Sequence, residues 1–368
     1  MPIGHSGRAR RPLRAGIIGT GFMGGVHARA VRSAGHLVSR VAGSNPATAA
    51  AAADQLGATA PAASVEELID SAEVDVVHVC TPNATHAEFA EQALAAGKAV
   101  VCEKPLATSA AEAERLTISA ARAGAVAAVP FVYRFYPTVR EVRSRVAAGE
   151  AGSLWLLHGS YLQDWLAGAG ESNWRVDPAL GGASRAFGDI GVHWCDLAEF
   201  VTGQRITRVA ARTANAHPVR DGQTAATEDG AVVIFATDQG ATGSVTVSQV
   251  TPGRKNRLWF SFDGTEASYS FDQEAPDTLW VGGRSENRVV LRGPDTLGPA
   301  AGAYATLPAG HPQGYADSFT AFVADVYAAV NGEPPDGLPT FADGYRAAVI
   351  TEAVVAAAKT DSWVEVPA

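Results

Sequence analysis

The chain has 368 residues, of which 47% are hydrophobic and 18% are charged, a balance typical of a packed globular protein rather than a disordered one. This length is too great for one ordinary core and suits two domains. The net charge of −9 argues against a nucleic-acid partner, because an acidic surface repels a phosphate backbone. No stretch reaches the roughly 18 to 20 apolar residues that cross a membrane.

The basic residues near the N-terminus are Arg8, Arg10, Arg11 and Arg14. No apolar segment follows them before the first predicted strand, so we interpret residues 1–12 as a disordered tail rather than a secretory signal. The cysteines are Cys80, Cys102 and Cys195. They form no C-x-x-C pair, and an odd number without metal-type spacing indicates buried, reduced thiols. We therefore expect a cytoplasmic protein with no metal site.

The first 130 residues alternate between predicted strands and helices. The predicted strands cover residues 13–19, 37–43, 74–81, 98–102 and 125–129. The predicted helices cover residues 22–33, 46–56, 84–96 and 109–123. A serine at position 64 and a glutamate at position 67 have the spacing of a capping box. This alternation predicts an α/β fold with a doubly wound parallel sheet, and we place a Rossmann dinucleotide-binding domain at residues 13–130.

The first strand-to-helix turn has the G-x-G-x-x-G pattern, Gly19-Thr-Gly21-Phe22-Met23-Gly24. The pattern alone is weak, but here it follows a predicted strand and opens a predicted helix, which is the context that makes it informative. The glycines allow a sharp turn and bring backbone N–H groups to a pyrophosphate at the helix N-terminus. The alternative is an ordinary tight turn between a strand and a helix.

The second strand is followed by Ser44-Asn-Pro, where an acid that binds a ribose would stand. An aspartate there would accept a hydrogen bond from the 2′-hydroxyl of NAD and repel the 2′-phosphate of NADP, and serine does neither decisively. No lysine or arginine lies between Ser44 and Ala53, so a 2′-phosphate has no local cation. The expected cofactor is NAD or NADP, with NAD slightly favoured.

Two groups of polar residues stand where catalysis is expected. Lys104 follows the strand at residues 98–102, at the carboxyl edge of the sheet where ligands bind. Asp189 and His193 are spaced i, i+4 and therefore share one face of a predicted helix. The alternative for Lys104 is a solvated surface ion pair. The alternative for the other two is an acid at a helix N-terminus beside a core histidine.

From residue 206 the pattern changes to an alternation of apolar and polar residues. The predicted strands cover residues 208–212, 231–236, 242–250, 257–262, 267–271 and 278–281, and the predicted closing helices cover residues 313–330 and 341–359. We predict a mostly antiparallel sheet in an α+β domain at residues 131–368, which binds the substrate. One sheet face is expected to pack on the helix of Asp189, and the other on a partner subunit in a homodimer or homotetramer.

Three stretches, taken in order, resemble the glucose–fructose oxidoreductase and inositol dehydrogenase family, written Gfo/Idh/MocA. They are the turn at Gly19, Thr81-Pro82-Asn83-Ala-Thr-His86 with the later Glu103-Lys104-Pro105, and Gly188-Asp189-Ile-Gly-Val-His193-Trp-Cys-Asp196. The resemblance extends over nearly the whole chain. It implies an enzyme in which Lys104 contacts the reacting oxygen, His193 moves the proton, and Asp189 assists His193 at the substrate.

The same resemblance, with the residues around it, implies two binding sets. The dinucleotide set is Gly19, Gly21, Phe22, Met23, Ser44, Thr81, Pro82, Asn83, His86, Glu103, Lys104, Arg134, Trp174 and Arg175. The substrate set is Lys104, Tyr133, Tyr161, Gln163, Trp165, Arg175, Asp189 and His193. A purely structural role for Arg134 is the open alternative, and Tyr161 and Trp165 are alternatively ordinary aromatics at a strand end.

The resemblance implies NAD(P)-dependent hydride transfer to or from a secondary hydroxyl of a sugar. The run from Gln163 through Trp174 to Asp189 resembles the levoglucosan dehydrogenase branch, whose members oxidise C3 of an anhydro-sugar or a related glycoside. Three alternatives remain open. They are an inositol or cyclitol dehydrogenase, a glycoside-processing enzyme that recycles its cofactor, and a non-catalytic regulator that binds the dinucleotide.

Overall fold

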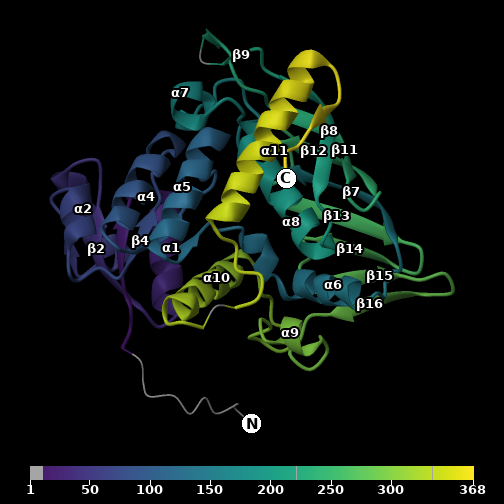
Figure 1. Ribbon diagram of the computed structural model, residues 1–368, viewed down its shortest axis with the longest axis horizontal. Helices are drawn as coiled ribbons and strands as arrows, with labels where there is room; N and C mark the ends of the chain where they lie inside the picture. Colours follow the sequence, from purple (N-terminus) through teal and green to yellow (C-terminus); the bar gives the residue numbers. More distant parts are fainter. Residues whose placement is uncertain (1–10, 221, 334) are drawn as a thin grey trace.

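The computed structural model describes residues 11–220, 222–333 and 335–368, and most of the predicted tail, including Arg8 and Arg10, lies outside them. The chain forms two layered bodies, each built on one sheet, and the long helix α11 (Phe341–Thr360) runs between them (Figure 1). Arg11 and Arg14 each form an ion pair with Asp75, at 2.9 and 3.0 Å. These two arginines of the basic cluster are therefore tied to the first body.

The first sheet has six parallel strands in the order β3-β2-β1-β4-β5-β6. Its strands are β1 (Arg14–Ile18), β2 (Leu37–Ala42), β3 (Ala60–Pro61), β4 (Val76–Val79), β5 (Ala99–Cys102) and β6 (Ala127–Ala128). Its helices are α1 (Phe22–Ser33), α2 (Pro46–Leu56), α3 (Val65–Asp70), α4 (His86–Ala95) and α5 (Ala110–Ala123). The strand order reverses between β1 and β4, and ligands bind at such a switch point. The predicted doubly wound parallel sheet is confirmed.

Local signals explain where these helices begin and end. The side chain of Asn45 accepts from the backbone of Thr48 at 2.9 Å, which caps α2, and Gly57 ends this helix with a left-handed φ of 65°. The predicted capping box of α3 forms only in part. Ser64 accepts from the backbone N–H of Glu67, but the Glu67 carboxylate accepts from the backbone of residue 63 instead of closing on Ser64.

The second sheet has nine strands in the order β16-β15-β14-β13-β7-β12-β11-β8-β17. The strands are β7 (Leu154–Leu162), β8 (Ile206–Ala214), β11 (Gly230–Thr237), β12 (Thr242–Ser248), β13 (Arg257–Gly264), β14 (Ser268–Asp272), β15 (Thr278–Gly282), β16 (Asn287–Leu291) and β17 (Val364–Glu365), and a separate hairpin joins β9 (Val219–Arg220) to β10 (Gln223–Thr224). All neighbours are antiparallel except β7 and β12, which confirms the mostly antiparallel sheet. The sequence did not predict β7, β16 or β17.

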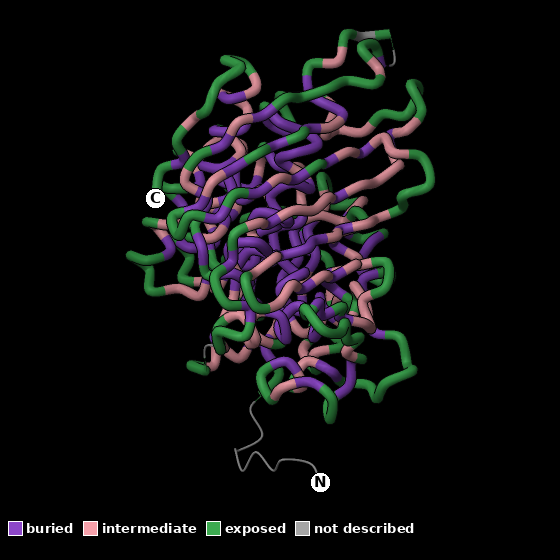
Figure 2. Tube along the Cα trace, turned by 90° about the vertical axis from the view of Figure 1, so that its right-hand side faces the viewer, coloured by how far each residue is buried: buried purple, intermediate pink, exposed green. Residues whose placement is uncertain are grey.

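Helices join the two sheets. The remaining helices are α6 (Pro137–Ala147), α7 (Pro178–Gly181), α8 (Val192–Thr202), α9 (Pro299–Gly302) and α10 (Tyr315–Val330). Helix α8 packs on the inner face of the second sheet, where the Trp194 indole donates to the backbone oxygen of Trp259 at 3.0 Å. Helix α10 packs on α1, and α11 packs on α5 and on β8. Buried residues gather where these layers meet, and exposed ones lie in the connecting loops (Figure 2).

The described part of the chain contains neither a candidate membrane-spanning helix nor a candidate metal-binding cluster. None of its helices combines the length and apolar character that a membrane span needs. Nor do its histidine, cysteine and acidic side chains gather into a group of three or more that could hold a metal ion.

Candidate active site

A cavity of about 580 Å³ opens at the carboxyl edge of the first sheet, beside the switch point. The glycine turn forms one wall. A Cβ atom at Gly19, where φ is 109°, would lie 2.5 Å from the backbone oxygen of Cys80, and one at Gly24 would lie 2.1 Å from the oxygen of Gly19. Only glycine fits these two positions. A Cβ atom at Gly21 would have no neighbour within 4 Å, so a ligand can approach the backbone of the turn there.

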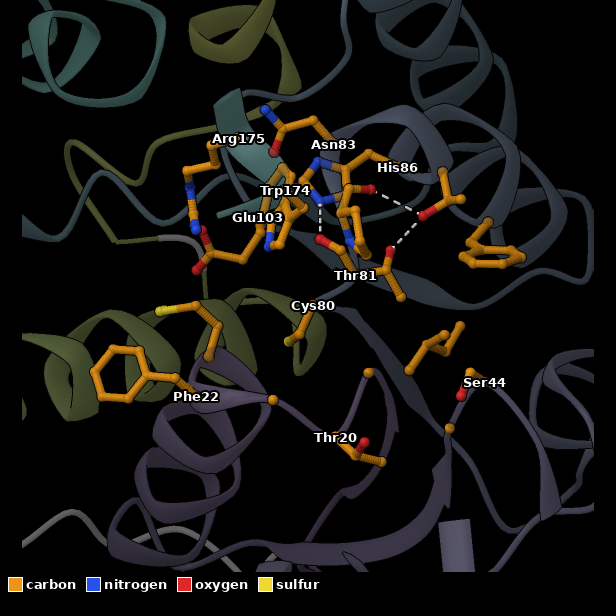
Figure 3. A pocket seen from close by; sticks show the side chains of 18 of the residues that line it. Thr20, Phe22, Ser44, Cys80, Thr81, Asn83, His86, Glu103, Trp174 and Arg175 are labelled. Carbon is orange, nitrogen blue, oxygen red and sulfur yellow. Dashed lines mark hydrogen bonds between the residues drawn. The ribbon is translucent and has the colours of Figure 1, made fainter. Parts of the chain in front are cut away.

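All of the predicted dinucleotide residues except Arg134 line this cavity. Ser44 lies at one end and Arg175, Glu103 and Phe22 lie at the other (Figure 3). Lys104 and Arg175 are the only lysine and arginine side chains among its described lining residues. Lys104 is the sequence neighbour of Glu103, and Glu103 and Arg175 both lie away from Ser44 (Figure 3). A glycine turn at a helix N-terminus fits the pyrophosphate of a dinucleotide. Neither an acid nor a cation stands at Ser44, so an extra 2′-phosphate would have no partner there.

Two of the predicted residues hold the loops around the cavity. One ring nitrogen of His86 lies 2.9 Å from the backbone oxygen of Thr81 (Figure 3). The other lies 2.8 Å from the backbone oxygen of Pro105, so His86 bridges the turns that follow β4 and β5. Asn83 donates from Nδ2 to the backbone oxygen of Gly181 at 2.8 Å. The hydrogen bond from Asn83 connects the first body to the segment that follows Trp174 and Arg175.

A second cavity of about 550 Å³ adjoins the first, and every predicted substrate residue lines it. The two cavities share six lining residues, which are Phe22, Met23, Glu103, Lys104, Asn173 and Arg175. A ligand in one cavity can therefore meet a ligand in the other at Glu103 and Lys104. Contact between two reactants at one junction is the geometry that hydride transfer requires.

The Nζ atom of Lys104 donates to the carboxylate of Asp189 and, at 3.0 Å, to its backbone oxygen. Gln249 donates to the other carboxylate oxygen at 2.7 Å, and Arg175 Nε lies 3.6 Å from Oδ1. The side chains of Lys104 and Asp189 are each 14% exposed. Burial opposes the charged carboxylate, but the charges of Lys104 and Arg175 outweigh it and lower the pKa of Asp189 to about 2.

His193 is 7% exposed, and its Nδ1 atom has no hydrogen-bond partner among the described groups. Burial and the neighbouring charge of Lys104 lower its pKa to about 3, so the ring is neutral near pH 7 and can accept a proton. The hydrogen bonds of the Asp189 carboxylate go to Lys104 and Gln249, and Asp189 acts on His193 through its charge. The carboxylate has no hydrogen bond to His193 among the described contacts, so we predict that any assistance of His193 by Asp189 is electrostatic.

The structure corrects the predicted contact of Arg134 with the dinucleotide. Its guanidinium donates to Asp196 from Nε at 2.8 Å and to Asp343 at 2.7 Å, and it lies 4.8 Å from the ring centroid of Phe200. Arg134 lines neither cavity. Its donors are committed to Asp196 and Asp343, which favours the structural alternative for this residue.

Sequence reasoning missed two residues that organise the site. Gln249, which is fully buried after β12, orients Asp189. Asn256 accepts from Tyr161 Oη at 2.8 Å and from Gln163 Nε2 at 2.7 Å, and it donates to Tyr133 Oη at 3.2 Å. It therefore connects three predicted substrate residues in one polar network. Both residues follow or precede strands of the second sheet, and no local spacing marks them.

The fold and the site together define a dinucleotide-dependent oxidoreductase. The chain belongs to the Gfo/Idh/MocA oxidoreductases: the family model for the NAD-binding Rossmann fold matches residues 13–131, and that for the GFO/IDH/MocA C-terminal domain matches residues 139–270. The predicted family and the predicted class of cofactor are confirmed.

Similar proteins cover almost the whole chain. Levoglucosan dehydrogenase of Pseudarthrobacter phenanthrenivorans is 32% identical over 96% of this chain and 98% of its own. A structure of levoglucosan dehydrogenase in complex with NADH and L-sorbose superposes with a TM-score of 0.91, at 31% identity over 97% of this chain and 100% of that one. An inositol dehydrogenase homologue from Azotobacter vinelandii, complexed with NAD+, has a TM-score of 0.89 at 26% identity over 99% and 100%.

Proposed function

We propose that the protein is an NAD-dependent dehydrogenase that oxidises a secondary hydroxyl of a sugar to a ketone and catalyses the reverse reaction. The observation that carries this proposal is the meeting of the two cavities at Lys104, with His193 on the wall of the second. The preferred substrates are pyranoses, anhydro-sugars such as levoglucosan, and glycosides, with C3 as the reacting carbon. The similarity to levoglucosan dehydrogenase over nearly the full length supports this choice.

Residues of the second cavity accept the proton of the substrate hydroxyl and stabilise the negative charge that develops on its oxygen. Bound NAD+ supplies the hydride acceptor, its nicotinamide ring. Lys104 donates from Nζ to the substrate oxygen and stabilises the negative charge that develops there. His193 accepts the hydroxyl proton at a ring nitrogen, because its ring is neutral near pH 7. The carboxylate of Asp189 then stabilises the imidazolium through its charge.

The lining of the second cavity suits a neutral polyol. A volume of about 550 Å³ is within the range of cavities that hold small molecules. Asn256, Tyr161 and Gln163 offer donors and acceptors, and a sugar needs them because a buried hydroxyl without a partner is costly. The indole of Trp165, which donates to Gln163 at 2.9 Å, supplies a flat apolar surface for a sugar ring.

The decisive experiment is a spectrophotometric screen of anhydro-sugars, free pyranoses, glycosides and inositols, each with NAD+ and with NADP+. We expect net NADH formation with a sugar of the first three groups and a weaker response with NADP+. Reduction of NAD+ by an inositol alone would favour a cyclitol dehydrogenase. Dinucleotide binding without net NADH would contradict the proposal, and product formation at a constant NADH level would then indicate a cofactor-recycling enzyme.

We also propose that the outer face of the second sheet joins subunits in a homodimer or homotetramer. Strand register places Ile234, His158, Trp280 and Val289 in one row across this face, on strands β11, β7, β15 and β16. Ile234, Trp280 and Val289 are 45%, 38% and 61% exposed. Serines lie between them in the row, so the apolar side chains stand toward its two ends, where they can contact a partner subunit. Light scattering after size-exclusion chromatography should give a dimer or tetramer, and Ile234→Glu with Trp280→Glu should give the monomer. A monomeric native protein would contradict this proposal.

The division of the chain at residue 130 remains part of the same proposal. The ends of the two family models, at 131 and 139, support a boundary there. Helices α10 and α11 nevertheless pack on the first body, so we expect residues 13–130 expressed alone to lose part of their apolar cover and to be less stable than in the full chain.

A further inference from the structure

Four buried titratable residues lie behind the glycine turn, and the proposed chemistry uses none of them directly. His27 of α1 places Nε2 3.0 Å from a carboxylate oxygen of Glu103, and its Nδ1 lies 2.8 Å from Nδ1 of His78 in β4. The other ring nitrogen of His78 lies 3.0 Å from the hydroxyl of Tyr327 in α10. His27, His78 and Tyr327 are 0% exposed, and Glu103 is 5% exposed. They form one continuous chain of hydrogen bonds.

The chemistry of these hydrogen bonds fixes the direction of the bond between His27 and Glu103. A carboxylate only accepts, so His27 donates its Nε2 proton to Glu103. Burial and the nearby His27 lower the pKa of His78 well below its ordinary value, so His78 carries one ring proton. That proton lies either on the nitrogen that faces His27 or on the one that faces Tyr327. If the proton faces His27, His78 donates it to an unprotonated Nδ1 of His27; if it faces Tyr327, His27 must itself donate from Nδ1 and carry both ring protons. In both arrangements His27 donates to Glu103.

Glu103 is the member of the chain that reaches the site. It lines both cavities, and its second carboxylate oxygen accepts from the backbone N–H of Lys104 at 3.1 Å. Burial favours the protonated acid, but the hydrogen bond and charge of His27 and the charges of Lys104 and His86 outweigh it and lower the pKa of Glu103. A buried carboxylate that lost such a donor would tend to take up a proton.

We propose that Tyr327, His78 and His27 are positioning residues that hold Glu103 as a carboxylate at the junction of the two cavities, where its charge favours oxidised over reduced dinucleotide. The oxidised nicotinamide ring carries a positive charge and the reduced ring carries none, so a fixed negative charge at the junction discriminates between them. This inference rests on the proposed function, since it requires the nicotinamide end of the dinucleotide to reach Glu103.

The test is direct binding in the absence of sugar, which separates this inference from the dehydrogenase activity. The dissociation constants of NAD+ and NADH are measured by calorimetry for the wild type, His27→Leu, His27→Gln, Tyr327→Phe and Glu103→Gln. In His27→Leu and Glu103→Gln we expect the preference for NAD+ over NADH to fall by roughly tenfold, because one charge is lost near the ring. His27→Gln retains an N–H donor and should recover part of the preference.

Tyr327→Phe removes one hydroxyl at the far end of the chain, and we expect a change of about twofold in the same direction, since hydrogen bonds in a chain strengthen one another. Tyr269→Phe is the matched control, because Tyr269 is 1% exposed on β14 and lines neither cavity. A merely structural lesion would weaken NAD+ and NADH binding equally and leave their ratio unchanged.

A double-mutant cycle closes the test. If the chain acts through the charge of Glu103, His27→Leu should have no further effect on the ratio in a Glu103→Gln background. Infrared difference spectra of the apo protein at pH 7, variant minus wild type, should show a new protonated carboxyl band for His27→Leu that is absent for Glu103→Gln,His27→Leu. An unchanged ratio in both His27→Leu and Glu103→Gln would overturn the inference. Failure of the wild type to bind either dinucleotide would overturn the proposed function itself.

Discussion

Lys104 donates from one Nζ atom to both the side chain and the backbone of Asp189, a residue 85 positions later in the chain. Lys104 follows β5 of the first sheet, and Asp189 lies in the π-helical turn, Phe187–Gly191, that leads into α8 on the second. Neither body alone contains all of the candidate site. The packing of one body on the other therefore sets the position of the cation relative to the acid and to His193.

Replacement of Lys104 by methionine should lower kcat by about 10²- to 10³-fold, the usual cost of removing a donor to a developing oxyanion. The dissociation constant of NADH should change by less than about threefold, because the glycine turn and the rest of the first cavity remain. Steady-state kinetics and NADH fluorescence measure the two quantities. Lys359→Met, an exposed change in the last turn of α11, is the control. A normal kcat in Lys104→Met would exclude the assigned role.

The buried neutral ring of His193 should make stability depend on pH. Its folded pKa of about 3 lies below the unfolded value, so at acidic pH the unfolded chain binds a proton that the folded protein does not. The contribution of His193 to the free energy of unfolding is therefore fully present above about pH 6.5 and is lost as the pH falls toward 3. Between pH 7 and pH 4 this group should cost about 3 kcal/mol. His193→Gln should show a correspondingly smaller loss in urea unfolding at the two pH values, and equal losses would contradict the buried neutral ring.

The periodic parts of the sequence predicted most of the fold. Helix α1 begins and ends at the predicted residues, because the glycine turn fixes its start and its apolar face is regular. Strands β16 and β17 were missed because both lie at sheet edges, where one is largely exposed and the other has two residues. Strand β7 was missed because small, polar and aromatic residues interrupt its alternation, although it lies at the centre of the sheet.

The candidate site could be predicted only where residues keep a family pattern. Lys104, Asp189 and His193 stand in such patterns, and the structure brings them together. The roles of Gln249 and Asn256 could not be predicted, because both arise from contacts between residues far apart in the sequence. Gln249 contacts Asp189 in the π-helical turn, and Asn256 contacts Tyr133 in the second cavity. Arg134 shows the opposite error, since a residue near a family motif turned out to be committed to a buried ion pair.

Gln249 should affect catalysis without affecting cofactor binding. Gln249→Leu removes the donor to one oxygen of Asp189 while Lys104 keeps the other. We expect kcat to fall by about tenfold and the sugar KM to change less, because a misplaced charge near His193 raises the barrier more than it weakens binding. Gln273→Leu is the matched control, since its Oε1 atom is also buried and unpartnered but it lines neither cavity. Equal effects of the two changes would indicate a general loss of stability.

Ser44 should determine the choice between NAD and NADP. Ser44→Asp is expected to lower kcat/KM for NADP+ by about tenfold or more, because the new carboxylate repels the 2′-phosphate and accepts from the 2′-hydroxyl of NAD+. Ser44→Arg should change the ratio in the opposite direction by supplying the missing cation. Both ratios come from initial rates with the best sugar of the screen. If neither variant changes the ratio, the adenosine ribose does not lie at Ser44.

Arg134 should matter for stability and not for cofactor affinity. Arg134→Met leaves Asp196 and Asp343 without their buried cation, and such a loss typically costs about 3–5 kcal/mol of unfolding free energy. Arg143→Met is a close control, because Arg143 also lies over Phe200, at 4.5 Å, but pairs with the exposed Asp336 and should cost less than about 1 kcal/mol. Chemical unfolding gives both values, and NADH titration of the folded protein should give the same dissociation constant for Arg134→Met as for the wild type. A weaker NADH affinity with normal stability would restore the predicted role of Arg134 at the dinucleotide, since a residue that only pairs with Asp196 and Asp343 cannot produce that combination.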